Sequence, residues 1–173
     1  PKGVGFVFIS GDAMLKPFID GGAQERNMRG GTENLHSIVG MSLALDLAYT
    51  QLAERQAHIK ELKEYLKAQL LANFADIYFI GDTEGGHYKI LNVCFPPSPK
   101  AELLLFNLDI SGISASGGSA CSSGAEAGSH VLMALNVAED RKCIRFSFSH
   151  LNTKAEIDFL VEKLKKMTPV LEG

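Results

Sequence analysis

The heptapeptide CIRFSFS, residues 143–149, alternates apolar and polar side chains along its length. A period of two is typical of a β-strand with one face on the core and the other face open. Arg145 and Ser147 then share the open face, while Phe146 and Phe148 share the core face. An arginine in such a strand needs an anionic partner, and a carboxylate matches its forked guanidinium. That partner is either an internal Asp or Glu or a bound anion, and the residues alone leave both open.

The elements upstream and downstream of this strand alternate between strands and helices. Three short strands and two helices are predicted at 77–80, 90–95, 110–115, 102–108 and 129–135. The last helix begins at a capping box of Thr153 and Glu156 and continues with an apolar stripe to Leu164. The sequence therefore predicts an α/β fold in which helices cover a small, mostly antiparallel sheet.

The first part of the chain has a long helical region in place of alternating short strands and helices. A helical region is predicted over residues 35–73, with apolar stripes and a bend near Ala53. Residues 4–9 (VGFVFI) read as a buried strand, which needs a neighbour on each side. No such neighbour precedes it, so we expect the chain to begin inside a larger domain.

Composition and charge narrow the class of protein. Of the 173 residues 46% are hydrophobic and 21% are charged, which is typical of a globular protein. A formal net charge of −3 argues against nucleic acid or acidic lipid as the main partner. The three cysteines form no CxxC pair, and the five histidines are scattered. We therefore expect neither a disulfide framework nor a metal site, and a reducing compartment. No apolar run is long enough to span a bilayer.

The segment SGGSACSSG, residues 116–124, places one thiol among small residues only. Its glycines free the backbone, so Cys121 could be carried to a partner as a nucleophile, and we expect the segment to be mobile. The alternative is a flexible linker that happens to contain a cysteine. Cys94 and Cys143 lie in apolar strands instead, and we expect both to be unreactive buried thiols.

A second glycine-rich segment, GGAQERNMRGGTEN, spans residues 21–34. It could enclose an anion, with Thr32 and backbone N–H groups facing it and Arg29 adding charge. A plain surface loop is equally consistent with these residues. The following helix would begin at Thr32 or Asn34 as N-cap.

These segments together resemble the C-terminal portion of the NifS-like cysteine desulfurases, in the class V PLP-dependent aminotransferase superfamily of fold type I. The resemblance runs over the whole chain and rests on several motifs in the expected order, namely residues 21–34, 117–124, 129–132, 145–147 and 152–153. It implies three parts: a remnant of the large cofactor-binding domain with its phosphate loop (1–34), a long linking helical region (35–73), and the small C-terminal domain with the Cys loop (74–173).

The resemblance also implies roles for particular residues. Cys121 would be the nucleophile that takes the sulfur of L-cysteine as a persulfide and releases L-alanine, with pyridoxal 5′-phosphate as cofactor. Arg145 would bind the substrate carboxylate. Thr32 would hold the cofactor phosphate of the neighbouring subunit in a homodimer, with Arg29 and Asn34 near the substrate in support. The sulfur would pass to an iron–sulfur scaffold or another acceptor protein in the cytoplasm, with no metal, nucleic acid or membrane involved.

The sequence departs from the family pattern at several positions. The chain begins within a Gly-Pro-Lys-Gly turn, so the aldimine lysine that precedes this turn is absent and Lys2 is no substitute for it. We therefore expect this chain alone to be inactive. Gly30 and Gly117 stand where serine is usual. A selenocysteine lyase, an aminotransferase-like enzyme or a non-enzymatic sulfur-accepting module remain the alternatives.

Overall fold

The computed structural model describes residues 2–81, 85–99, 101–117 and 129–171. The chain divides into two compact units, Pro1–Ala53 and Glu54–Gly173. Each unit is described below by itself. Cys121 lies outside the described residues, as do all residues from 118 to 124 of the segment for which the sequence predicts mobility.

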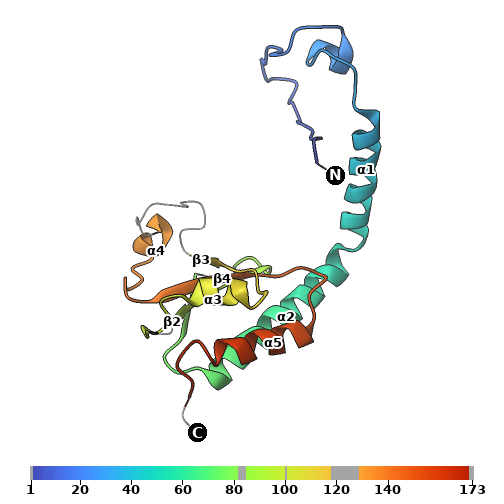
Figure 1. Ribbon diagram of the computed structural model, residues 1–173. Helices are drawn as coiled ribbons and strands as arrows, with labels where there is room; N and C mark the ends of the chain where they lie inside the picture. The colour runs from blue at the N-terminus through green and yellow to red at the C-terminus, as the bar shows by residue number, and fades with distance from the viewer. Residues whose placement is uncertain (1, 82–84, 100, 118–128, 172–173) are drawn as a thin grey trace. The chain divides into compact units, whose positions relative to one another are not determined.

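The first unit contains one short 3-10 helix, η1 (Gln24–Asn27), and the helix α1 (Leu35–Thr50), as Figure 1 shows. Of the two predicted caps, Asn34 is the N-cap of α1, and its side chain accepts a hydrogen bond from the backbone N–H of Ser37 at 3.3 Å. The predicted strand at residues 4–9 is wrong, because this segment forms no strand. A strand needs a neighbour to pair with, and the described residues provide none for it.

The predicted helical region 35–73 forms two helices, α1 and α2 (Leu52–Asn73), which are separated at Gln51. Their apolar stripes have different surroundings. Along α1 the stripe is open, since Val39 is 68% exposed and Leu43 is 60% exposed. Along α2 the predicted stripe lies in the core, where Leu66 and Leu70 have no exposed surface.

The second unit is built on a four-stranded sheet. Its strands are β1 (Tyr78–Ile80), β2 (Ile90–Phe95), β3 (Ser116–Gly117) and β4 (Lys142–Ser147). Their order is β1-β2-β4-β3, and every neighbouring pair is antiparallel. The prediction of an α/β fold with a small antiparallel sheet is therefore confirmed.

The helices α3 (Leu104–Ile110), α4 (His130–Ala134) and α5 (Lys154–Leu164) complete this unit. The predicted strand at 110–115 is wrong, because Ile110 still belongs to α3 and the strand begins only at Ser116. The helix ends in a turn at Gly112, whose φ of +78° is a left-handed conformation that favours glycine. The chain becomes extended and pairs with β4 only beyond that turn.

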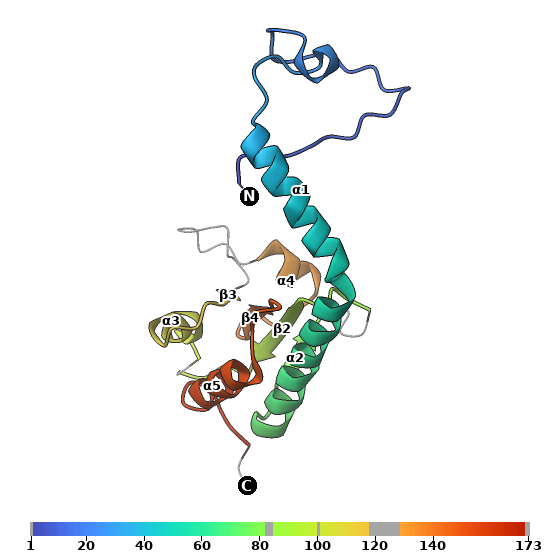
Figure 2. The ribbon, with the colours of Figure 1, turned by 90° about the vertical axis from the view of Figure 1, so that its right-hand side faces the viewer.

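One hydrophobic core joins the sheet to the helices α2, α3 and α5, which Figure 2 shows around it. Alternate residues of the two middle strands enter this core: Leu91, Val93 and Phe95 from β2, and Ile144 and Phe146 from β4. Because side chains of a strand alternate between faces, the remaining residues of β2 and β4 lie on the opposite face. Arg145 is one of them.

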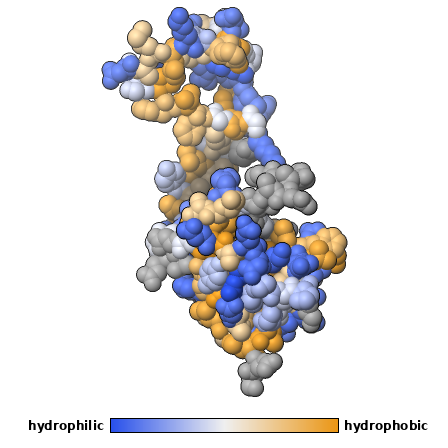
Figure 3. Space-filling view, turned by 90° about the vertical axis from the view of Figure 1, so that its left-hand side faces the viewer, coloured by the Kyte–Doolittle hydropathy of each residue, from blue (hydrophilic) through white to orange (hydrophobic). Residues whose placement is uncertain are grey.

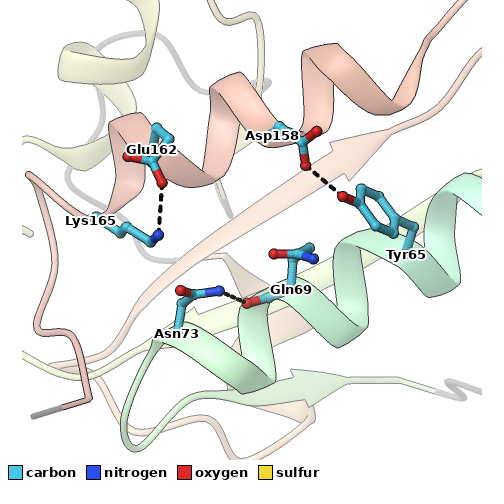
Figure 4. A network of polar contacts seen from close by, with 6 residues as sticks. All are labelled: Tyr65, Gln69, Asn73, Asp158, Glu162 and Lys165. Carbon is cyan, nitrogen blue, oxygen red and sulfur yellow. Dashed lines mark hydrogen bonds and ion pairs between the residues drawn. The ribbon is translucent and has the colours of Figure 1, made fainter. Parts of the chain in front are cut away.

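Polar contacts join α2 to α5 on the outside of the core. The Tyr65 hydroxyl donates to an Asp158 carboxylate oxygen at 2.6 Å, which Figure 4 shows, and this hydrogen bond raises the pKa of Tyr65. The hydrogen bond and ion pair between Glu61 and Lys154 lower the pKa of Glu61. The predicted capping box of α5 is confirmed, since the Thr153 hydroxyl accepts from the backbone N–H of Glu156 and the Glu156 carboxylate accepts from that of Thr153.

A disulfide bond joins Cys94 of β2 to Cys143 of β4. The prediction that Cys94 and Cys143 are unreactive buried thiols is wrong, because the two are bonded to each other. The two residues are 49 positions apart in the chain but stand directly opposite each other in the sheet. The pairing depends on the register of β2 against β4, which cysteine spacing does not reveal.

Exposed apolar side chains occur on both units, as the orange surface in Figure 3 indicates. In the first unit Phe6, Phe8 and Phe18 are each at least 78% exposed. In the second unit one exposed group lies on and beside α3 and includes Leu103, Phe106 and Ile110. Among the described residues, no helix combines the length and the apolar character needed to cross a membrane.

Candidate functional site

Arg145 lies in the middle of the sheet. It is on β4, directly opposite Asn92 of β2 on one side and Ser116 of β3 on the other. Residues directly opposite in antiparallel strands point to the same face, so these three side chains share the face that the core helices do not cover. Ile144 and Phe146, on either side of Arg145 in the chain, are buried in the core and fix which way Arg145 points.

The Arg145 side chain has no anionic partner within the described part of the chain. Arg145 takes part in none of the ion pairs found among the described residues. Arg141, four residues earlier, is different: it donates to both a carboxylate oxygen and the backbone carbonyl of Asp76. Arg141, which directly precedes β4, thus has a structural partner in Asp76. Arg145, which lies within β4, is exposed, and its guanidinium donors are free to bind an anion.

The strand beside Arg145 leads into the Cys121 segment. Ser116 and Gly117 form β3, and the described chain stops there until residue 129. Gly117 packs against α3, since a Cβ atom placed on it would lie 3.2 Å from Cδ2 of Leu105. A side chain at this position would require the end of the Leu105 side chain to shift by a few tenths of an ångström.

The glycine-rich segment of the first unit folds back on itself. The backbone N–H of Gly30 donates to the carbonyl of Ile19 at 3.2 Å, and that of Gly31 donates to the Gln24 side chain at 3.0 Å. Gly30 is the one fully buried residue of this described loop, and a Cβ atom placed on it would come within 2.7 Å of the Gly21 Cα. Gly21 and Gly30, one from each glycine pair, are thus needed for this close backbone contact.

The three predicted residues of this segment have distinct surroundings. Arg29 donates to the backbone carbonyl of Gly31 at 3.4 Å and so holds the loop together. The Asn34 side chain is occupied as the N-cap of α1. Thr32 lies between them and is exposed, and its hydroxyl makes no hydrogen bond to the described residues. Thr32 is therefore the member of this group that is free to contact a ligand.

The structure brings Arg29, Thr32 and Asn34 together in the first unit and places Arg145 in the second. The sequence did not predict which residues flank Arg145, because Asn92 and Ser116 become its neighbours only through strand register. Within the described residues, no cluster of His, Cys, Asp or Glu is arranged to hold a metal ion.

Comparison with known proteins identifies the family to which the chain belongs. The class-V aminotransferase profile matches residues 1–160. A cysteine desulfurase of Gluconacetobacter diazotrophicus is 37% identical over all of this chain and 45% of its own length. The cysteine desulfurase NifS of Azotobacter vinelandii is 33% identical over all of this chain and 43% of its own length. The solved structure of a NifS-like protein from Rickettsia africae ESF-5 superposes with a TM-score of 0.71 at 29% identity, covering 90% of this chain and 40% of that one.

The chain therefore belongs to the class-V aminotransferase family. Within that family the relatives that it matches are cysteine desulfurases and NifS-like proteins. The chain spans about 45% of the length of the first of these relatives.

The family depends on pyridoxal 5′-phosphate, and the glycine-rich loop fits one part of that cofactor. A phosphate group requires N–H and O–H donors in a segment where no side chain blocks its approach. Thr32 offers an exposed hydroxyl, whereas the backbone N–H groups of Gly30 and Gly31 already donate within the loop. The Thr32 hydroxyl thus fits one contact to the phosphate. No lysine of this chain is assigned to the aldehyde.

Proposed function

We propose that this chain is part of a pyridoxal-phosphate-dependent cysteine desulfurase that converts L-cysteine to L-alanine and carries the released sulfur as a persulfide on Cys121. The observation that carries the proposal is the unpaired Arg145 on the open face of the sheet, beside the strand that leads to Cys121. The desulfurase relatives support the same assignment.

In this proposal Arg145 binds the carboxylate of L-cysteine. Its exposed guanidinium can form two parallel hydrogen bonds to a carboxylate, and the described residues offer no competing anion. Asn92 and Ser116, on either side, are polar neighbours of the bound group. This arrangement fixes the substrate by the end that does not react.

Cys121 performs the sulfur chemistry. Its thiolate attacks the substrate sulfur, so an S–S bond forms while the C–S bond breaks and its electron pair stays on carbon. When bound, the cofactor stabilises that electron pair. The carbon then takes up a proton, and alanine leaves. The persulfide sulfur is afterwards transferred to a thiol of an acceptor protein.

Thr32 contacts the phosphate of the cofactor bound in the neighbouring subunit of a homodimer. Arg29 and Asn34 keep the loop in shape through the contacts described above. We place the enzyme in the cytoplasm, in line with a role in supplying sulfur for iron–sulfur clusters.

The exposed apolar residues around α3 are suited to the acceptor protein. A cavity of about 500 Å³ beside α3 is lined by two carboxylates, Glu102 and Asp109, and by four apolar residues: Leu103, Leu105, Phe106 and Ala115. Ala115 directly precedes β3. An acceptor with an apolar side chain flanked by basic residues would match this surface. Phe106→Asp should therefore slow sulfur transfer to the acceptor without changing persulfide formation on Cys121. Equal loss of both steps would count against this docking surface.

The test of the function uses the full-length protein with L-cysteine, and measures alanine and protein-bound persulfide. Arg145→Ala should lower kcat/KM by about 30- to 1,000-fold, equivalent to about 2–4 kcal/mol, mainly through KM. The matched control is Arg141→Ala, which removes an arginine from the same region whose partner is Asp76. That variant should lose thermal stability and keep its KM. If Arg145→Ala destabilises the protein but keeps its kinetic constants, the role of Arg145 is structural and the proposal fails.

A further inference from the structure

The disulfide between Cys94 and Cys143 lies at a position that the proposed reaction does not use. The two residues are directly opposite in β2 and β4, and their Cα atoms are 4.1 Å apart. A separation this short is typical of the closely spaced pairs of an antiparallel ladder, in which opposite side chains touch. The strand pairing alone therefore holds the two sulfur atoms side by side, whether or not the bond between them is formed.

The two cysteines differ in their access to solvent. Cys94 has no exposed surface and is followed in β2 by Phe95, which is also fully buried. Cys143 is half-buried and is the second residue of β4, which follows an exposed turn at Glu139 and Asp140. A small thiol or disulfide in solution must reach a sulfur atom in order to exchange with it, so exchange is expected to begin at Cys143, the more exposed of the two residues.

We propose that Cys94 and Cys143 are a redox-active couple that exchanges with small disulfides of the glutathione class, with Cys143 reacting first and Cys94 resolving. In the oxidising direction the Cys143 thiolate attacks one sulfur of oxidised glutathione, which forms a mixed disulfide and releases one glutathione thiolate. The Cys94 thiolate then attacks the Cys143 sulfur, closes the Cys94–Cys143 bond and releases the second glutathione. Two protein thiols lose two electrons, and one glutathione disulfide gains them as two thiols. Reduced glutathione reverses both steps, again beginning at Cys143.

The proposal is independent of the desulfurase reaction, since its reactants are the two cysteines and glutathione alone. Cys121 is the third thiol of the chain, so the experiment uses the Cys121→Ser background in order that every observed adduct belongs to the couple. The reduced chain is freed of reductant and mixed with oxidised glutathione, and intact mass and peptide mapping follow the products over time.

With both cysteines present, the chain should lose two hydrogens and retain no glutathione. Cys94→Ser lacks the resolving thiol, so it should gain one glutathione at Cys143. Cys143→Ser should react more slowly, by on the order of tenfold or more, because its remaining thiol is fully buried. In urea both variants should react at the same rate, which assigns the difference to the fold rather than to the thiols themselves.

Two results would overturn the proposal. One is equal rates of glutathione addition to the two folded variants, with far-UV circular dichroism confirming that both are folded. The other is a chain that keeps both thiols free, or keeps a stable glutathione adduct, while Cys94 and Cys143 are both present.

Discussion

Reduction of the Cys94–Cys143 bond should lower the free energy of unfolding by about 4 kcal/mol. The bond joins residues 49 positions apart, and closing a loop of that length removes entropy from the unfolded chain equivalent to about 4 kcal/mol at 25 °C. For a unit of this size the same change lowers Tm by roughly 15 °C. The loss is expected to be large because the bond joins the two middle strands, which the unfolded chain would otherwise leave far apart.

The measurement is urea unfolding followed by circular dichroism, with and without a strong thiol reductant. The control is the Cys94→Ala/Cys143→Ala double variant, whose unfolding midpoint should not respond to the reductant at all. The oxidised protein should also have the smaller m-value, since its unfolded state is more compact. Identical midpoints for the oxidised and reduced protein, or the same shift in the double variant, would refute the argument.

Three further outcomes follow from the packing of α2 and α5. Leu66→Ala should cost about 3–5 kcal/mol in chemical denaturation because Leu66 is fully buried, whereas Leu71→Ala on the exposed side of the same helix should cost far less; equal costs would mean that α2 does not cover the sheet. Thr153→Ala should cost about 1 kcal/mol by removing the acceptor of the capping box, and a Thr153→Ser variant should recover most of it. The hydrogen bond from the Thr153 backbone lowers the pKa of Glu156 in the folded state. The ionised Glu156 carboxylate therefore stabilises the fold above the pKa of the unfolded state, and this stabilisation is lost as pH falls through the pKa of the folded state. The difference in Tm between wild type and Glu156→Gln should close on acidification, and a difference that stays constant would contradict this assignment.

Local patterns predicted the elements whose signals lie in a few neighbouring residues. The capping box at Thr153, the alternation around Arg145 and the strand at 90–95 all depend on short-range geometry, and the structure has each of them. Where the predictions failed, the deciding contact lies elsewhere in the chain. Residues 4–9 have the composition of a buried strand but no described strand beside them.

In the candidate site, too, the sequence predicted one residue from its local pattern but not the residues around it. Arg145 stands out in the sequence because a charged residue interrupts an apolar pattern, and the structure gives it no competing partner among the described residues. Its neighbours Asn92 and Ser116 could not be predicted, because a register shift of one residue would turn each of them to the other face. The disulfide was missed for the same reason. The role of Cys121 remains a prediction, since it lies outside the described residues.

The strand order β1-β2-β4-β3 and the disulfide together determine how the chain is covalently connected. β2 and β4 are neighbours in the sheet, so everything between Phe95 and Lys142 leaves the middle of the sheet and returns to it. That excursion includes α3, β3 and the Cys121 segment, and the Cys94–Cys143 bond ties its two ends together. A peptide bond cut anywhere inside it leaves two fragments that stay joined until the disulfide is reduced.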